Sequence, residues 1–545
     1  MTARLGTGLA ALGLLVTAPL AAAEIDTGTA VDLSWDNSLV LGTMFQPNSG
    51  DASDGGGCYL ASAYARAFGT GEAGCGRRYG FTSARATWQS ELDVAYRGFG
   101  LRASGDAWYD PVYDRFATEY APETAPETAQ SAAAPAHQYF ILRDGYARDH
   151  EVALRDAFLY GTIARDEDQL LSFRLGRHTL LWGESLFFPE NGIAAGQAPV
   201  DTYLYQPSGY DRANSPFLPV GQGSVSWQPA PGVALAAFYQ FEWRRSLIAP
   251  YGAYASAAQI LTQRDAETIG LTVPGAGPQL FRRAQDQTPG SSDQFGVTVK
   301  WTHGEFDYAL AALSYNAKEP ELYVDPSAGR YRLAYPKGIE SFGASIAGPL
   351  GDGNFAAELS ARRGMPLVNG GILVPPGVAA DNNAHALYPL GDTLHAQLSW
   401  TTETPPLPGI PGGARWSTEI AANRLLEVTA NSTRLIPGRT ADAAAFRTMF
   451  APRFFQVLPG LDLTVPVQVG YNFLGLSETD PAMNRGTGDV GIAVTATLRQ
   501  SWKASLGFTH YFGHSKNDFT PFDPVGARRR LSYYDFFALT IERSF

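Results

Sequence analysis

The stretch Val233-Ala-Leu-Ala-Ala-Phe-Tyr-Gln-Phe-Glu-Trp243 decides the fold class. Its odd-numbered positions are all apolar or aromatic, whereas its even-numbered positions include Gln240 and Glu242. Apolar residues that repeat every second position are typical of a β-strand with one apolar face, because a helix repeats its apolar face about every 3.6 residues. The run also has about the ten residues that a tilted strand needs to cross a bilayer.

The same alternation recurs along the chain. The run from Leu461 to Phe473 has Leu, Val, Tyr and Phe on one face and mainly Asp, Thr, Gln and Asn on the other. We predict eighteen strands, with sixteen or fourteen as alternatives, near residues 31–45, 82–97, 99–109, 150–163, 168–182, 222–229, 232–245, 293–302, 305–316, 338–347, 353–363, 391–401, 414–429, 446–457, 460–473, 488–498, 502–513 and 531–545. The strand at 150–163 is the weakest, because Arg155 and Asp156 put a charge on each face.

The connections between these strands fall into two classes. Short joints occur at 229–232, 302–305, 458–460 and 499–501, whereas long stretches occupy 46–80, 110–149, 183–221, 246–292, 317–337 and 365–390. Short periplasmic turns and long external loops are characteristic of outer-membrane β-barrels. Five tryptophans, Trp227, Trp301, Trp400, Trp416 and Trp502, lie beside short or Pro-rich joints, where an interfacial aromatic girdle would place them.

The last strand supports a transmembrane antiparallel β-barrel. Phe537, Leu539, Ile541 and the terminal Phe545 share one face. A final strand that ends in Phe is the usual assembly signal of outer-membrane barrels. Because a closed barrel cannot be divided, we expect residues 24–545 to form one domain with both ends in the periplasm.

Residues 1–23 have the pattern of a secretory signal peptide. Arg4 is their only charge, an apolar run from Leu5 to Leu20 follows, and three small alanines precede Glu24. An N-terminal membrane anchor is the alternative, which the short apolar run disfavours. We expect the mature protein to lie in the outer membrane of a Gram-negative bacterium, in contact with lipid.

Cys58 and Cys75 are the two cysteines, and they lie in a Gly-rich stretch. An oxidising compartment favours a loop disulfide between them. A zinc site is the competing interpretation, but two thiols without a nearby His are a poor ligand set. His510 and His514 would need a helix to share a metal ion, whereas the local pattern is a strand. We therefore expect no metal site.

Composition excludes several classes of protein. The mean hydropathy of -0.14 argues against a bundle of membrane helices, and the 12% aromatic content argues against a disordered chain. Removal of residues 1–23 leaves 40 basic and 53 acidic residues, a net charge of -13, which argues against nucleic-acid binding. No Gly-x-Ser-x-Gly motif precedes a predicted helix, so we expect neither an enzyme nor a cofactor.

A barrel of about eighteen strands encloses an aqueous channel unless something fills it. The loop 183–221 could fold into the lumen as a constriction, or it could pack on the external rim. Some polar residues occupy the strand positions opposite the apolar face and are expected to point into the lumen, and others lie in or beside this loop. The candidates for lumen and selectivity residues are Arg174, His178, Trp182, Glu184, Glu358 and Arg362. The alternative is that these residues are solvated wall positions or ion pairs that stiffen the barrel.

Several motifs together resemble one family. Arg174-Leu-Gly-Arg177 with Leu181-Trp-Gly-Glu-Ser185, Phe238-Tyr-Gln-Phe-Glu-Trp243, Met365-Pro-Leu367, Leu461-Asp-Leu-Thr-Val-Pro466 and the final strand are similar to blocks of the domain-of-unknown-function-1302 (DUF1302) family of proteobacterial outer-membrane proteins. The chain departs from the family pattern at His178, where Gln is more usual, and in the low-complexity insert 121–136.

The resemblance implies a porin-like conduit for hydrophobic, lipid-like or sterol-like small molecules. It also implies two kinds of partner, a periplasmic lipid-carrier protein and an export pump of the resistance-nodulation-division superfamily. The alternatives are a plugged surface barrel whose loops bind partners, and a general porin.

Overall fold

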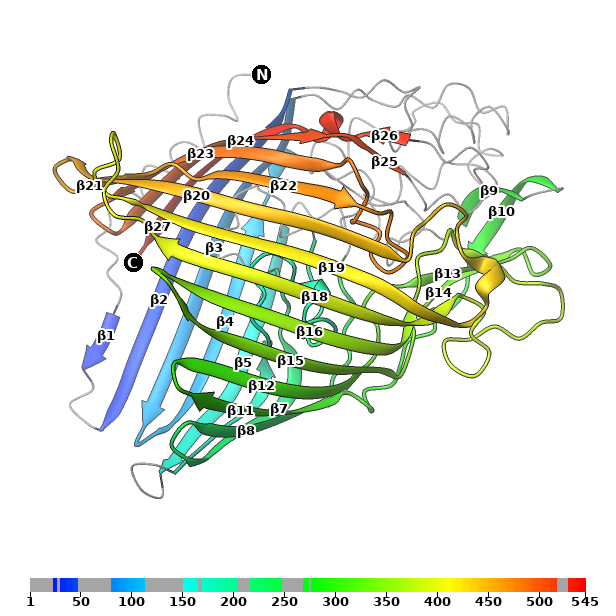
Figure 1. Cartoon of the computed structure of the whole chain (residues 1–545), viewed down its shortest axis with the longest axis horizontal. Helices are drawn as coiled ribbons and strands as arrows, with labels where there is room; N and C mark the ends of the chain where they lie inside the picture. Colours follow the sequence, from blue (N-terminus) through cyan, green and yellow to red (C-terminus); the bar gives the residue numbers. More distant parts are fainter. Residues whose placement is uncertain are drawn as a thin grey trace.

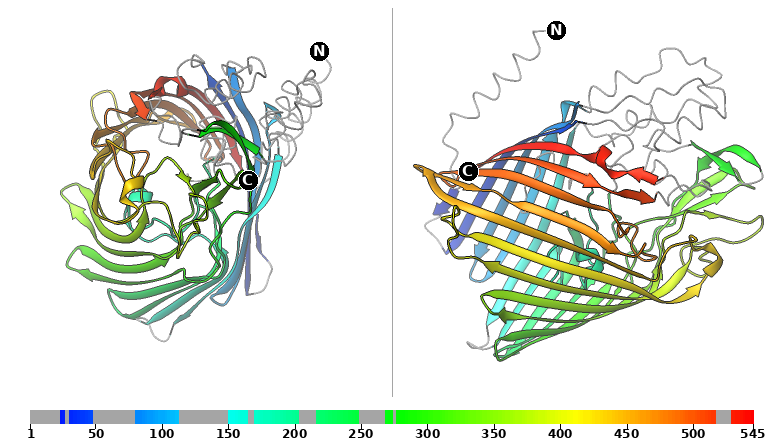
Figure 2. Two further views of the ribbon diagram at one scale, coloured as in Figure 1. Left: turned by 90° about the vertical axis from the view of Figure 1, so that its right-hand side faces the viewer. Right: turned by 45° about the horizontal axis from the view of Figure 1, so that its top comes forward.

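A closed antiparallel wall of strands dominates the molecule (Figure 1). The structure is a computed structural model that describes residues 23–26, 30–47, 80–112, 150–164, 169–202, 216–247, 268–273, 276–516 and 528–545. Each wall strand pairs with its neighbour in sequence, and β27 (Phe536–Ser544) pairs with β2 (Val31–Gln46) to close the ring. Seen from the end that carries the long loops, the strands surround an interior (Figure 2, left).

Eighteen strands form the wall, as the sequence predicts. Between β2 and β27 they are β3 (Gly80–Tyr96), β4 (Phe99–Tyr109), β5 (His150–Ala164), β6 (Leu170–His178), β7 (Val220–Ala230), β8 (Val233–Gln240), β11 (Phe295–His303), β12 (Phe306–Tyr315), β15 (Ile339–Leu350), β16 (Gly353–Pro366), β18 (Leu390–Glu403), β19 (Ala414–Ala430), β20 (Asp442–Leu458), the pair β21 (Leu461–Thr464) and β22 (Val467–Leu474), β23 (Gly488–Leu498) and β24 (Trp502–Phe512). The short β1 (Ala23–Asp26) pairs with the first half of β2.

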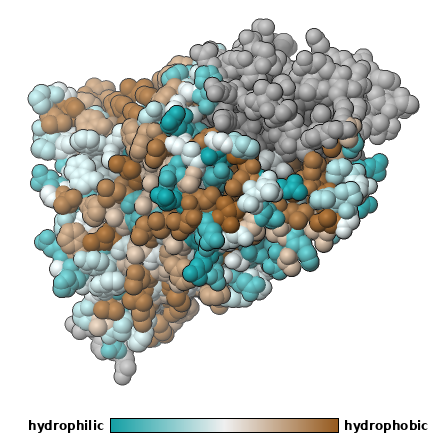
Figure 3. Space-filling model, turned by 45° about the vertical axis from the view of Figure 1, so that its right-hand side comes forward, coloured by the Kyte–Doolittle hydropathy of each residue, from teal (hydrophilic) through white to brown (hydrophobic). Residues whose placement is uncertain are grey.

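The wall has an apolar outer face and a polar inner face. On β16, β18 and β19, Leu359, Leu398 and Ile420 are 50%, 46% and 44% exposed, whereas the intervening polar side chains are buried. Hydrophobic residues recur over the wall in the space-filling view (Figure 3). Such an outer face is what lipid contact requires of a transmembrane barrel. In the described ranges, no helix has the length and apolarity to cross a membrane.

Five predicted strands differ clearly from the structure. The strand predicted over 232–245 ends at Gln240, and the strand predicted over 446–457 begins at Asp442. The strand predicted over 460–473 is divided at Val465 and Pro466, because proline has no backbone N–H to donate to the ladder. The strand predicted over 168–182 ends at His178, where the chain turns into the barrel. The strand predicted over 531–545 starts with the short 3-10 helix η5 (Leu531–Tyr534), so β27 begins at Phe536.

A β-bulge explains how the weakest predicted strand fits the wall. In β5 the pairing register shifts between Leu154 and Ala157, opposite Ser104 of β4. The extra residue turns two consecutive charged side chains toward the lumen. Arg155 binds Asp106 at 2.7 Å, and Asp156 accepts a 3.0 Å hydrogen bond from Ser104. No charge in this pair faces lipid.

The two ends of the barrel differ as predicted. The short turns lie at one end with Phe545, whose backbone pairs with Asn37. At the opposite end, three long loops contribute β9 (Thr268–Val273), β10 (Gly277–Arg283), β13 (Glu321–Asp325), β14 (Arg330–Ala334) and β17 (Ile372–Leu373) to a separate five-stranded sheet. The sequence pattern did not predict this sheet. A further loop carries β25 (His514–Lys516) and β26 (Arg528–Arg530). Residues 1–22 of the predicted signal peptide and the predicted disulfide Cys58–Cys75 lie outside the described residues, so both stay predictions.

Candidate functional site

Residues 179–202, which we call the inward segment, leave the wall after β6 and lie inside the barrel. The segment is visible in teal behind β15, β16 and β18 (Figure 1). Apart from the three-residue η2 (Pro189–Asn191), it has no regular structure. Its backbone N–H groups therefore need acceptors from elsewhere, because an unpaired buried N–H is costly. The loop predicted at 183–221 thus folds into the lumen in its first part.

Glu358 of β16 supplies one set of acceptors. Its carboxylate accepts hydrogen bonds from the backbone N–H of Glu184 and, at 2.9 Å, from that of Ile193. The side-chain amide of Gln397 on β18 donates to the same carboxylate at 3.3 Å. One inward carboxylate thereby ties together two parts of the segment that are nine residues apart in sequence.

Glu419 of β19 supplies a second set. Its carboxylate accepts from the Ser185 hydroxyl at 3.1 Å and from three successive backbone N–H groups, those of Leu186, Phe187 and Phe188. A carboxylate that accepts several backbone N–H groups is a strong, directional anchor, because hydrogen bonds to a charged group are about twice as strong as neutral ones. Glu419 therefore fixes the turn before η2.

Asn191 and Arg362 complete the polar attachment. Asn191 donates to the backbone carbonyls of Ala396 and Ala422, and its side-chain oxygen accepts from His395 at 3.0 Å. Arg362 of β16 donates to two carbonyls of the segment, at Glu190 and Gly192, at 2.9 and 2.8 Å. The segment is thus attached to β16, β18 and β19 through both its donors and its acceptors.

Two glycines permit this close approach. A Cβ at Gly192 would lie 2.6 Å from a Glu358 oxygen and 2.4 Å from the Gln397 amide nitrogen. At Gly183 the backbone has a φ of +119°, and a Cβ would lie 2.4 Å from Glu358. Only a residue without a side chain fits against the carboxylate at these positions.

The opposite side of the inward segment is apolar. Trp182 packs edge-to-face on Phe238 of β8, with 5.0 Å between the ring centroids. Trp182 and Ile193 form one buried cluster with Phe238 and with Ala311 and Leu313 of β12. The interior of the barrel is therefore divided: a polar wall holds the segment through hydrogen bonds, and an apolar wall packs against it.

The structure brings four of the six sequence-derived lumen candidates together. Trp182 and Glu184 belong to the inward segment, and Glu358 and Arg362 bind it. Two other candidates lie apart from these contacts. His178 is buried against Ser224 at 3.0 Å, and the Arg174 guanidinium lies 5.7 Å from the Phe158 ring centroid.

Sequence reasoning missed Glu419 and Asn191. The inward orientation of Glu419 was readable, because the neighbouring Trp416 and Ile420 occupy the outer face of the same strand. The pairing of Glu419 with residues 185–188 had no sequence signal, since more than 230 positions separate the two.

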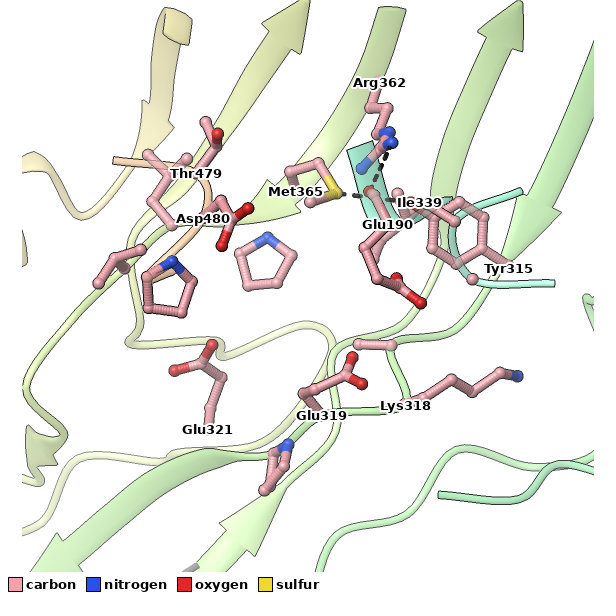
Figure 4. A pocket seen from close by; sticks show the side chains of 18 of the residues that line it. Glu190, Tyr315, Lys318, Glu319, Glu321, Ile339, Arg362, Met365, Thr479 and Asp480 are labelled. Atoms are coloured by element: carbon pink, nitrogen blue, oxygen red, sulfur yellow. Dashed lines mark hydrogen bonds between the residues drawn. The ribbon is translucent and has the colours of Figure 1, made fainter. Parts of the chain in front are cut away.

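A cavity of about 430 Å³ lies between the inward segment and the long-loop end of the barrel (Figure 4). Most of its lining is apolar and comes from the wall and from the loops after β12, β16 and β22; it includes Tyr315, Ile339, Met365, Leu367 and Pro481. The Tyr315 hydroxyl donates to the Met365 sulfur at 3.5 Å. We call this space the loop-side cavity.

Four carboxyl groups from three segments also line the loop-side cavity. Glu190 belongs to the inward segment, Glu319 and Glu321 to the loop after β12, and Asp480 to the loop after β22. Burial raises the pKa of all four, and for Glu321 to about 7. Burial also lowers the pKa of the neighbouring Lys318, to about 7. Within the described part of the chain, no three His, Cys, Asp or Glu side chains are placed to hold a metal ion.

Comparisons with solved structures return outer-membrane channels. The chain is similar to the outer membrane channel DcaP of Acinetobacter baumannii, with 10% identity, 96% of this chain and 100% of that chain covered, and a TM-score of 0.38. It is similar to OccAB1 of Acinetobacter baumannii, with 8% identity, coverage of 96% and 99%, and a TM-score of 0.44. It is also similar to OccK2 (OpdF) of Pseudomonas aeruginosa, solved in complex with glucuronate, with 11% identity, coverage of 94% and 98%, and a TM-score of 0.40.

No curated protein sequence matches the chain. A family model does match it, over residues 4–545 and thus over essentially its whole length. The motifs that resembled this family in the sequence lie at the inward segment, in the wall and in the closing strand. The chain belongs to the family described as "Protein of unknown function (DUF1302)".

Proposed function

We propose that this protein is a channel of the Gram-negative outer membrane that conducts hydrophobic or lipid-like small molecules. The observation that carries the proposal is the loop-side cavity, an apolar space inside a transmembrane barrel and directly above the inward segment. Ligand sites with mostly apolar walls and a few polar groups bind small molecules by removing their apolar surface from water. A cavity at the external end of a barrel is a suitable first binding site for such a molecule.

The inward segment is the gate in this proposal. It is held by hydrogen bonds on one side and by apolar packing on the other, without a covalent link to the wall in between. In this proposal, a molecule leaves the loop-side cavity toward the periplasm by passing this segment. Displacement of the segment from its carboxylate anchors would open the lumen.

A flux measurement tests the proposal. Uptake and efflux of labelled sterols, fatty acids and hydrocarbons would be compared in a strain that lacks the gene, with and without the wild-type copy. We expect the flux of at least one class to fall in the deletion strain and to return on complementation. Unchanged flux for all three classes would contradict the proposal.

A plugged surface barrel is the second candidate, and the dense attachment of the inward segment favours it. A general porin is the third. Planar-bilayer conductance separates them, since a general porin shows a steady ionic current, whereas a plugged barrel shows none. A conduit for apolar molecules passes little ionic current but still shows the substrate flux described above.

Two partners extend the proposal through the family resemblance, a periplasmic lipid-carrier protein and a pump of the resistance-nodulation-division superfamily. They would meet the barrel at its short turns. Crosslinking from a photoreactive residue placed at Glu305, in one of these turns, would capture the carrier. Absence of any periplasmic adduct, with a lipid-facing position as control, would argue against this part of the proposal.

A further inference from the structure

We propose that the loop-side cavity selects an apolar small molecule that carries a protonated amine. This inference rests on the proposed function, because it names the substrate class that the same cavity would accept. The cavity combines apolar walls with carboxyl groups that lack a cationic partner. Its ligand must therefore combine an apolar body with a positive charge.

The carboxyl groups face the cavity from different directions. In Figure 4 the Glu190 and Glu319 carboxyl groups point toward each other, while Glu321 and Asp480 lie on the other side of the space. Glu190 and Glu319 lie deep in the molecule yet keep accessible surface, because they face the cavity. The acidic groups therefore surround the ligand space.

Each carboxyl group that has a side-chain or backbone donor receives it from a neutral group. Ser246 donates to Glu319 at 2.8 Å, Asn369 donates to Glu321 at 2.6 Å, and the Ala482 N–H donates to Asp480 at 2.8 Å. In the described ranges none of these carboxyl groups forms a salt bridge. Carboxyl groups that line an apolar space and form no direct ion pair favour the arrival of a cation.

The two cationic side chains at the cavity are engaged elsewhere. The Lys318 ammonium points away from the carboxyl groups and donates to Gln294 (Figure 4). Arg362 donates to the carbonyls of Glu190 and Gly192 and holds the inward segment in place. Neither side chain forms an ion pair with the acidic groups, and their charges act on these groups only from a distance, Arg362 on Glu190 and Asp480 and Lys318 on Glu319. Four carboxyl groups against these two basic side chains leave room for a further positive charge on the ligand.

The spacing of the acidic groups favours an organic cation over a bare metal ion. Within the described residues, the carboxyl groups do not converge on one point as metal ligands do. They are distributed around an apolar space of about 430 Å³. A bulky hydrocarbon with one ammonium group fills such a space and places its charge near several carboxylates. A ligand carboxylate would instead add a further negative charge.

Three probes of one shape test the inference. 1-Adamantylamine, 1-adamantanol and 1-adamantanecarboxylate share a compact apolar body and differ in charge. Their binding to the purified full-length protein in a non-ionic detergent would be measured by titration calorimetry at pH 8. We expect the amine to bind about tenfold more tightly than the carboxylate, with the alcohol between them.

The double variant Glu319→Gln/Glu321→Gln should abolish the preference between amine and carboxylate. Glu305→Gln, an exposed carboxylate in a short turn, is the matched control and should leave the preference unchanged. Heat-modifiable migration on SDS gels, which distinguishes a folded barrel from an unfolded chain, would show whether each variant folds. The comparison of probes on the wild-type protein needs no variant, so it stands even if a variant does not fold.

Equal affinity for the three probes, a preference for the carboxylate or no binding would each overturn the inference. Because the measurement is binding and not flux, its failure differs from failure of the proposed channel. Transport of hydrophobic compounds without any preference for amines would overturn the inference, while the proposed channel function would still hold. Selective binding of the amine without any flux would support the inference and contradict the proposed channel.

Discussion

The two sides of the inward segment meet opposite kinds of wall. β16, β18 and β19 offer carboxylates, amides and a guanidinium, whereas β8 and β12 offer Phe238, Ala311 and Leu313. Hydrogen bonds are directional, so the polar side determines where the segment lies. Apolar burial is not directional, so the other side adds free energy without fixing one position. The difference predicts that polar variants move the segment and apolar variants loosen it.

The largest effect is expected from Glu358→Ala with Glu419→Ala. The double change removes the acceptors of at least five backbone N–H groups, and each hydrogen bond to a charged group contributes about 1.5–3 kcal/mol. We expect the inward segment to be released, with a severalfold rise in single-channel conductance and new protease cleavage within 179–202. Glu340→Ala, at an outward position of β15, is the control. An unchanged conductance with an intact segment would show that the polar side does not determine its position.

A smaller effect is expected from Trp182→Ala. Removal of a buried Trp costs about 3–5 kcal/mol of local stability, but the carboxylate anchors remain. We expect faster hydrogen exchange within 179–202 and little change in conductance. Trp301→Ala, at the outer face near a short turn, is the matched control. Conductance that rises as much as in the double glutamate variant would remove the distinction between the two sides.

Gly192→Ala should displace the inward segment moderately, as expected of a variant on its polar side. The new Cβ would meet the Glu358 carboxylate and the Gln397 amide, so the segment must shift away from β16 and β18. We expect a conductance increase that is smaller than that of the double glutamate variant. Gly223→Ala in β7 is the control, since its Cβ would make an ordinary 3.6 Å contact. Identical behaviour of the two variants would argue against close packing at Gly192.

The smallest effect concerns pH. Glu321 has a pKa raised to about 7 and Lys318 a pKa lowered to about 7. Between pH 8 and pH 6, Glu321 gains a proton and loses its negative charge, while Lys318 gains a positive charge. Glu190, whose pKa burial raises to about 8, changes in the same direction. Burial also raises the pKa of Glu319 and that of Asp480 above their ordinary values, and Arg362 is the other basic side chain at the cavity.

Both changes disfavour a cation, so the affinity for 1-adamantylamine should fall severalfold from pH 8 to pH 6. Binding at pH 7 should release protons, which calorimetry detects as a dependence on the ionisation enthalpy of the buffer. Constant affinity over this range would show that these groups do not face the ligand.

The sequence predicted the wall far better than its contents. Each wall strand carries its own signal, because the alternation of residues such as Leu359 and Glu358 requires no knowledge of the neighbouring strand. The bulge at Arg155 and Asp156 has a weaker signal, two adjacent charges that lipid would not accept. The contact of Asn191 with His395, and the four carboxyl groups of the loop-side cavity, depend on loops that meet only in the folded chain.

The distance along the chain between the inward segment and its anchors has a consequence for assembly. Glu358 and Glu419 follow their backbone partners by 165 to 233 residues. If the barrel is built strand by strand from its first strand, the N–H groups of Glu184, Ile193 and residues 186–188 have no carboxylate acceptors until β16 and β19 are in place. A chain interrupted before β19 would thus leave residues 185–188 without their Glu419 anchor, so the interior is completed only after two thirds of the wall strands have formed.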